Sequence, residues 1–248
     1  MIKIKSRQEI ELITKSCQIL ASVKTKVRAA VRPGVSLEEL DSIAYNETIK
    51  AGAKPAFLGY MGFPKTICAS INEELIHGIP SKRILKDGDL VSIDMGLIYK
   101  GYYSDSAFTI SVGKVTKENA FLINAAEQAF YEGLAAIKPG AKTGDIAYAI
   151  GKYIKEQNLY TPDEFSGHGI GTKLHEDPLV LNDGKPGTGI LLQDGMVICI
   201  EPMILQKSKR IKILADGWTV VSQSGLKSSH YEHTVLIKDG KGVILTEE

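Results

Sequence analysis

The stretch that decides the fold runs from residue 91 to residue 112 and reads VSIDMGLIYKGYYSDSAFTISV. Two partly alternating apolar runs flank Lys100 and Gly101, a pattern typical of two antiparallel strands joined by a tight turn. Folded as this hairpin, the stretch brings the carboxylates of Asp94 and Asp105 close together on one face of a sheet. Neighbouring carboxylates on apolar strands repel each other, so we expect a metal ion or a basic partner between them.

Composition narrows the class of protein. The chain has 248 residues, enough to bury a full core as one large domain or as two halves. Its net charge is +1, which gives no sign of a nucleic-acid or membrane surface. No apolar run approaches the roughly 20 residues of a membrane span, and the N-terminus lacks a signal-peptide pattern. The 3 cysteines show no paired spacing and fit reduced thiols, so we expect a cytoplasmic protein.

Four helices are predicted outside the hairpin. Capping boxes at residues 6–9 and 36–39 open two of them, which end before the Pro-Gly pair at 33–34 and near residue 52. Two further helical patterns run over residues 117–136 and 143–157. Strands are predicted over residues 66–71 and 231–237.

The order helix, Pro-Gly, helix, strand, carboxylate occurs twice in the chain. In this repeat Asp94 corresponds to Glu201, and Asp105 corresponds to Glu232 after an insertion. A chance match is the alternative, because Pro-Gly breakers after helices are common. We interpret residues 1–248 as a single domain with an internal repeat, roughly 1–115 and 116–248. Two such halves related by a pseudo-twofold axis would bring all four carboxylates to one site.

Four converging carboxylates favour a pair of divalent cations, which lie about 3.5–4 Å apart in two-metal hydrolytic sites. Glu201 interrupts an apolar run, and a charge there is almost never buried without a partner. His168 lies in a glycine-flanked loop and adds an imidazole, so the donor set suits Mn, Fe, Co or Zn. Spacing alone assigns no role to His77 or His175, which could equally be core or surface histidines.

Taken together, these residues resemble the type I methionine aminopeptidases. The resemblance implies an α+β pita-bread fold, shared with aminopeptidase P, prolidase and creatinase, in which two pseudo-twofold-related halves form an antiparallel sheet covered by helices. It covers essentially the whole chain. It rests, in order, on Cys68-x-Ser70-x-Asn72-Glu73-x-x-x-His77-Gly78-Ile79-Pro80, on Asp94 and Asp105, on Gly167-His168-Gly169-Ile170-Gly171-x-x-x-His175-Glu176-x-Pro178, on Ile200-Glu201-Pro202-Met203 and on Glu232-His233-Thr234.

The resemblance implies a ligand set for two divalent metal ions, of Fe, Mn, Co or Zn. Asp94 would chelate one ion, Asp105 and Glu232 would bridge both, and His168 and Glu201 would complete the other. In the family, a metal-bridging hydroxide attacks the first peptide bond of the substrate. The same five positions follow from the repeat and from the burial of Glu201, except that His168 breaks the symmetry of the halves.

The resemblance also implies catalytic and substrate-binding residues. Glu201 would accept a proton, His175 would stabilise charge at the scissile amide, and His77 would act near the scissile nitrogen. Both histidines would contact substrate. An apolar slot suited to a thioether would be lined by Phe57, Tyr60, Phe63, Cys68, Leu174 and Trp218.

The sequence departs from the family pattern at several positions. Leu174 replaces the usual Phe, Thr172 the usual Arg, and His230 the usual Gln two residues before Glu232. Cys199 shares a strand face with Glu201. We interpret it as a packed core thiol, with a thiol pointing near the metals as the alternative.

The function expected from the resemblance is removal of the initiator methionine from nascent proteins and peptides with a small second residue. Such a protein would act near the ribosome, as a monomer. One alternative is a proline-directed peptidase of the same fold, although those relatives usually carry a large extra N-terminal domain. The other is a pita-bread peptide-binding module without catalysis, although such relatives lack several ligands. The type II enzymes carry an insertion between the positions of His168 and Glu201, which this chain lacks.

Overall fold

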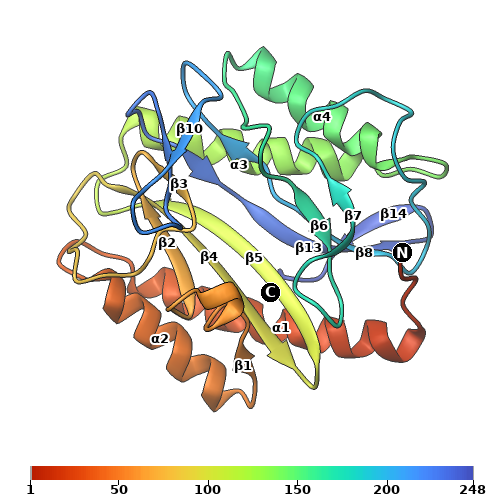
Figure 1. The fold of residues 1–248 in the computed structure, drawn as a ribbon, viewed down its shortest axis with the longest axis horizontal. Helices are drawn as coiled ribbons and strands as arrows, with labels where there is room; N and C mark the ends of the chain where they lie inside the picture. The colour runs from red at the N-terminus through yellow and green to blue at the C-terminus, as the bar shows by residue number, and fades with distance from the viewer. Residues whose placement is uncertain (1, 248) are drawn as a thin grey trace.

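A curved antiparallel sheet with helices packed against it makes up the protein, and the computed structural model describes residues 2–247 (Figure 1). The helices predicted from the sequence are present within about two residues of their expected bounds. Within the described range they are α1 (Arg7–Ala30), α2 (Leu37–Lys50), α3 (Lys117–Ala135) and α4 (Thr143–Glu156), with a single 3-10 turn, η1 (Tyr60–Gly62). Capping boxes begin α1 at Ser6 and α2 at Ser36, as predicted. No helix in this range is both long and apolar enough to span a bilayer.

The main sheet has the strand order β1-β4-β5-β13-β8-β6-β7, with β2 also paired to β4 and β14 to β13. Every pairing is antiparallel. The strands are β1 (Lys54–Pro55), β2 (Ile67–Ile71), β4 (Leu90–Tyr99), β5 (Tyr102–Ser111), β6 (Gly167–Gly169), β7 (Glu176–Val180), β8 (Val197–Ile200), β13 (Glu232–Lys238) and β14 (Lys241–Ile244). Two small sheets at one end comprise β3 (Glu74–Ile76), β10 (Ile211–Ile213) and β11 (Val220–Ser222), and β9 (Met203–Ile204) with β12 (Ser229–His230).

The predicted hairpin is β4 and β5. The strands pair from Leu90↔Ser111 to Tyr99↔Tyr102. The turn residues Lys100 and Gly101 have φ of +49° and +85°, the left-handed values that a two-residue hairpin turn requires. Asp94 lies opposite Ala107, two residues from Asp105, so both carboxylates emerge on the same face.

The middle of the sheet lies between β5 and β13, where Glu232 pairs with Ala107 and His233 with Ser106. Reading outward from this joint, β4 and β2 follow β5, and β8 and β6 follow β13. The strand order therefore has the symmetry expected of two related halves. In the second half, no tight turn joins β8 to β13, because β9 to β12 lie between them in the chain.

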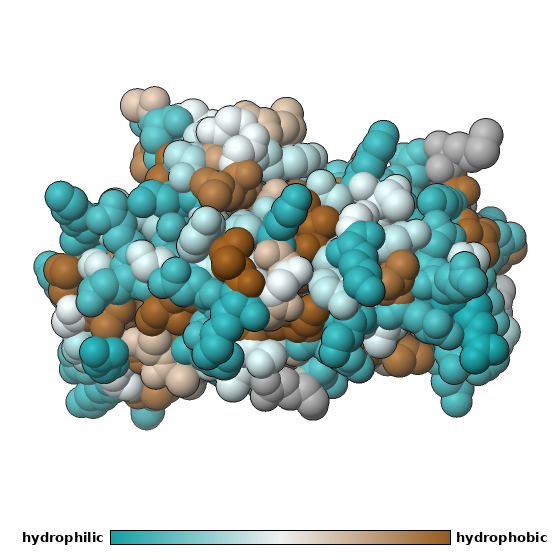
Figure 2. Space-filling view, turned by 90° about the horizontal axis from the view of Figure 1, so that it is seen from below, coloured by the Kyte–Doolittle hydropathy of each residue, from teal (hydrophilic) through white to brown (hydrophobic). Residues whose placement is uncertain are grey.

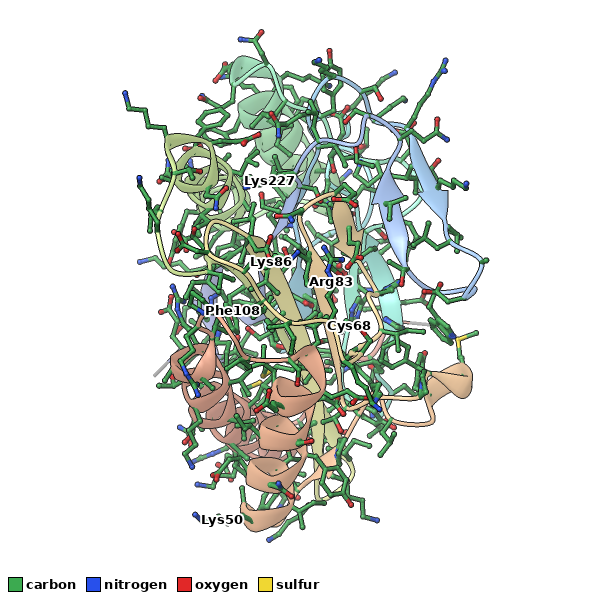
Figure 3. All side chains as sticks on the ribbon, turned by 90° about the vertical axis from the view of Figure 1, so that its left-hand side faces the viewer. Lys50, Cys68, Arg83, Lys86, Phe108 and Lys227 are labelled. Atoms are coloured by element: carbon green, nitrogen blue, oxygen red, sulfur yellow. The ribbon has the colours of Figure 1, made fainter. Side chains whose placement is uncertain are left out.

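The core lies between the sheet and its helices. Under the first half, Leu20 and Val23 of α1 pack in one buried cluster with Ile93 and Phe108. Figure 3 shows Phe108 and Cys68 on opposite sides of the strands, with Phe108 on the side of α1 and α2. The outer face on that side is largely hydrophilic, with hydrophobic side chains scattered over it (Figure 2). The helices thus occupy one face of the sheet and leave the other for the carboxylates.

The apolar run from Met196 to Leu205 is not one continuous strand. The strand β8 ends at Ile200, and β9 begins at Met203. Proline lacks an amide hydrogen, so Pro202 interrupts the ladder and Glu201 lies just beyond the strand end.

Candidate metal centre and substrate pocket

Every side chain predicted for the site lines one cavity of about 300 Å³. The set comprises Phe57, Tyr60, Phe63, Cys68, His77, Asp94, Asp105, His168, Leu174, His175, Glu201, Trp218 and Glu232. Four lining residues were not predicted: Met61, Ile76, Phe165 and Ser166. They lie in loops or at the end of a short strand, where no periodic pattern marks them. Only Phe165 has a specific contact that sequence could not indicate, an edge-on packing against His77 with ring centroids 5.5 Å apart.

The carboxylates come from both halves of the sheet. Asp105 projects from β5 and Glu232 from β13, and each is no more than 4% exposed. Burial raises the pKa of Asp105, Glu201 and Glu232 well above the ordinary carboxyl value, and repulsion between neighbouring carboxylates raises it further. Burial also raises the pKa of Asp94, and the nearby His230 offsets part of this rise. Such a cluster is unstable as four bare anions and calls for a compensating cation.

The unpaired oxygens in this cluster fit a metal. Within the described residues, Asp94 Oδ1, Asp105 Oδ1 and Glu232 Oε1 are buried and have no hydrogen-bond partner. Buried polar atoms are nearly always paired, so three orphaned carboxylate oxygens on converging strands indicate an absent ligand. A donor set of carboxylates with an imidazole is the set that divalent Mn, Fe, Co or Zn accepts.

His168 faces this cluster from β6. Its Nε2 lies 3.7 Å from Glu201 Oε1 and 3.9 Å from Asp105 Oδ2. Its Nδ1 lies 2.9 Å from the backbone oxygen of Gly169, the second contact that usually orients a metal-binding imidazole. Burial lowers the pKa of His168 to about 3, so the ring is neutral and its Nε2 lone pair is available.

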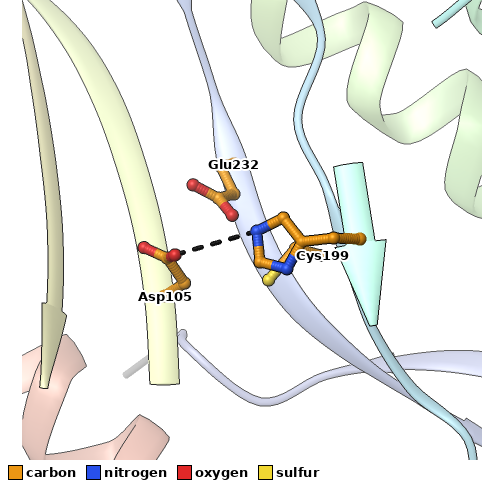
Figure 4. Close-up of side chains that lie close together, drawn as sticks. Asp105, Cys199 and Glu232 are labelled. Carbon is orange, nitrogen blue, oxygen red and sulfur yellow. Dashed lines mark ion pairs between the residues drawn. The ribbon is translucent and has the colours of Figure 1, made fainter. Parts of the chain in front are cut away.

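Cys199 lies beside these donors. One ligand atom each from Asp105, His168, Cys199 and Glu232 lies within 4.8 Å of the others (Figure 4). The thiol is fully buried, as its interpretation as a core residue required, and its Sγ is 3.7 Å from Thr234 Oγ1. The sulfur also lies close to the carboxylates, so the alternative, a thiol that points near the metals, stays a prediction.

The two remaining predicted histidines, His77 and His175, also line the cavity. The Nδ1 of His175 is 2.8 Å from the hydroxyl of Tyr60, and its ring packs edge-on to His168 with centroids 4.3 Å apart. His77 has a φ of +58° at the end of β3, and burial lowers its pKa to about 4. Both imidazoles therefore face the space in front of the carboxylates.

An apolar wall closes the cavity beside the carboxylates. Phe63 and Trp218 meet edge to face with ring centroids 5.1 Å apart, and Cys68 and Leu174 are buried. Thr172 is exposed and bonds Glu176 through its backbone N–H at 2.8 Å, so it lies outside this wall. The cavity thus joins a charged, ligand-rich end to an apolar end.

The chain belongs to Metallopeptidase family M24, whose model matches residues 11–239, and the buried carboxylate cluster at the centre of its sheet suits that class of enzyme. Within the family it is similar to the methionine aminopeptidases. It is 46% identical to the methionine aminopeptidase of Borreliella burgdorferi and 42% identical to methionine aminopeptidase 1 of Bacillus subtilis. These alignments span 99% of this chain and 98% and 99% of the relatives.

Solved structures agree on the pita-bread fold. Methionine aminopeptidase from Thermotoga maritima superimposes with a TM-score of 0.97 at 37% identity, and all of both chains is covered. Prolidase from Pyrococcus furiosus superimposes with a TM-score of 0.81 at 28% identity, and the match covers 99% of this chain but 65% of the prolidase. The match therefore covers the whole of the methionine aminopeptidase but only part of the prolidase.

Proposed function

We propose that the protein is a metal-dependent methionyl aminopeptidase, which hydrolyses the first peptide bond of chains that begin with methionine. The observation that carries this proposal is the junction of a buried carboxylate cluster with a closed apolar slot in one cavity. The slot is lined by aromatic rings and a thiol, a surface that suits an unbranched thioether. The full-length similarity to methionine aminopeptidases supports the same substrate.

Five side chains would hold two divalent metal ions: Asp94, Asp105, His168, Glu201 and Glu232. When bound, such ions lower the pKa of water and polarise a carbonyl group. The identity of the ions, among Fe, Mn, Co and Zn, depends on geometry and availability. Cys199 lies close enough to tune this centre by its bulk and weak polarity.

The other polar residues would act on protons and on the substrate backbone. Glu201 accepts a proton at its carboxylate, a role favoured by its raised pKa. His175, as a neutral imidazole with Nδ1 held by Tyr60, donates a hydrogen bond from Nε2 to the developing oxyanion. His77 contacts the substrate near the scissile nitrogen. The slot formed by Phe57, Phe63, Leu174 and Trp218 positions the methionine side chain and excludes water.

The physiological substrates would be nascent polypeptides whose second residue is small, because the carboxylate cluster leaves little room beside the scissile bond. We further propose that the protein acts as a monomer in the cytoplasm near ribosomes. These features follow from the resemblance to the family.

A peptide assay tests the proposal. The protein is stripped with a chelator, reloaded with Mn²⁺ or Co²⁺, and given Met-Ala-Ser, with Ala-Pro and Leu-Ala-Ser as competing substrates. We expect metal-dependent release of methionine, which His168→Ala abolishes. Cleavage of Ala-Pro in preference to Met-Ala-Ser would support the proline-directed alternative. No release by the metal-loaded protein would overturn the enzyme assignment.

A further inference from the structure

One imidazole beside the carboxylate cluster has no role in the site described so far. His230, in β12, is 1% exposed, and neither ring nitrogen has a hydrogen-bond partner among the described residues. Other histidines nearby are anchored, since His168 Nδ1 contacts the Gly169 oxygen and His175 Nδ1 contacts the Tyr60 hydroxyl. A buried imidazole with two unused nitrogens is rare in native proteins and indicates an absent partner.

Hydrogen bonds hold the backbone of His230 in place. The N–H of His230 donates to Thr109 Oγ1 at 2.9 Å, and that hydroxyl donates to the His230 oxygen at 2.7 Å. Ser92 Oγ, 2.7 Å from Thr109 Oγ1, completes the arrangement as its donor. His230 also pairs with Met203 across β9 and β12. The backbone of His230 is therefore held at the edge of the strands that carry the site, and the ring is enclosed by the packing around it.

The ring points at the carboxylates. His230 Nε2 lies 3.5 Å from Glu201 Oε2, while the other oxygen of Glu201, Oε1, lies 3.7 Å from His168 Nε2. The Glu201 carboxylate thus lies between two imidazoles. One donor atom each from Glu201, His230 and Glu232 lies within 4.8 Å of the others. This spacing is that of donors able to converge on one ion.

We propose that His230 is a further nitrogen ligand of the metal centre, binding a divalent cation together with Glu201 and Glu232. This inference rests on the proposed function only in taking the carboxylate cluster as a metal centre. The ligand set then contains two imidazoles, those of His168 and His230, one on each side of Glu201. Nitrogen ligands favour Co²⁺ and Zn²⁺ over Mn²⁺, so His230 also sets metal preference.

Metal binding by His230→Gln tests the proposal directly. The stripped wild-type protein and the variant are dialysed against Co²⁺ or Mn²⁺ and their metal content is measured. We expect the variant to bind at least one equivalent of Co²⁺ tenfold or more weakly, with a smaller loss for Mn²⁺. The visible absorption bands of bound Co²⁺ should change as well, because they report the number and type of its ligands.

His77→Gln is the matched control. It also removes a largely buried imidazole from the same cavity, but His77 packs edge-on against Phe165 and Trp218 and belongs to neither group of donor atoms that could hold a cation among the described residues. We expect this variant to bind Co²⁺ with wild-type affinity and spectrum. Thermal unfolding of both metal-free variants shows whether each is folded before metal is added.

X-ray absorption of the wild-type protein loaded with Co²⁺ provides a test that needs no variant. The inference requires two imidazole ligands per protein. A single imidazole, or a His230→Gln protein with unchanged Co²⁺ affinity and spectrum, would overturn it. Methionine release by the wild-type protein in that case leaves the proposed function standing. The opposite result is also distinguishable. If the wild-type protein releases no methionine but His230→Gln still weakens metal binding, the proposed function is overturned and the assignment of His230 as a metal ligand is supported.

Discussion

The hydroxyl of Tyr60 lies 2.8 Å from Nδ1 of His175, and this contact joins the apolar wall to the catalytic end of the cavity. We assign the phenol as the donor of this hydrogen bond, which places the imidazole proton on Nε2. Nε2 is then the nitrogen able to donate to substrate. The tautomer of His175 is therefore set by a residue of the methionine slot.

Tyr60→Phe should lower kcat for Met-Ala-Ser by about 2- to 10-fold, the effect of losing one hydrogen bond of about 0.5–1.5 kcal/mol. The metal content should not change, because Tyr60 contacts none of the five proposed ligands. Steady-state kinetics at pH 7.5, with the exposed Tyr45→Phe as control, measures the effect. An unchanged kcat would show that Tyr60 only fills space.

Phe63→Leu should raise KM for Met-Ala-Ser by about 2- to 12-fold with a smaller change in kcat. Phe63 packs edge to face with Trp218 at 5.1 Å, and such an aromatic contact contributes about 0.5–1.5 kcal/mol. Phe121→Leu, on the exposed surface of α3, is the matched control and should leave both constants unchanged. Equal losses in kcat and kcat/KM would instead assign Phe63 to the transition state.

Glu232→Ala should remove both metal ions, because Glu232 would bridge them from β13. Equilibrium dialysis followed by metal analysis should find well under one equivalent at concentrations that saturate the wild-type protein. Glu73→Ala, at a partly exposed position outside the cavity, should bind as the wild type does. Two tightly bound ions in Glu232→Ala would contradict the bridging assignment.

The contribution of the carboxylate cluster to the stability of the metal-free protein should fall as the pH rises above 4.5, while the buried histidines, whose pKa values are lowered, act in the opposite direction. The pKa values of Asp105, Glu201 and Glu232 are raised above their ordinary 3.8, 4.5 and 4.5, so the folded state binds more protons than the unfolded state. That contribution is fully present below the unfolded pKa and is lost as the pH rises through the folded one. Urea unfolding across pH, with Asp105→Asn as a shallower comparison, measures it.

Saturating Mn²⁺ should cancel this slope, because bound metal holds the carboxylates deprotonated. At a free concentration 100 times the dissociation constant, the ion stabilises the fold by about 2.7 kcal/mol. For a chain of this size, that corresponds to a rise in Tm of about 5–10 °C. If the stability of metal-free Asp105→Asn depends on pH in the same way as that of the wild-type protein, the buried-carboxylate geometry is contradicted.

The first half of the site could be predicted because its signals are local. The alternation of apolar and polar residues and the glycine turn predict that Asp94 and Asp105 lie on one face of the hairpin. The register of β4 and β5 confirms this prediction. The helices were equally predictable from capping boxes and periodicity. Each of these features is settled by residues within about ten positions of one another.

The second half of the site could be predicted only from the internal repeat, because β8 and β13 lie far apart in the chain. No local pattern pairs Val235 with Ile198, and Pro202 hides the end of β8 inside an apolar run. The contacts of Phe165 and His230 could not be predicted at all, since both depend on how loops pack after the sheet has formed. The division into two halves remains a prediction supported by the symmetric strand order.

The joint between β5 and β13 also sets when the protein can first work during its own synthesis. Asp94 and Asp105 leave the ribosome early, whereas Glu232 emerges only with the last long strand of the sheet. Until then, the early carboxylates have no partners with which to hold a cation. A partly made chain therefore holds only part of the proposed ligand set, and the site is complete only after β13 has paired with β5.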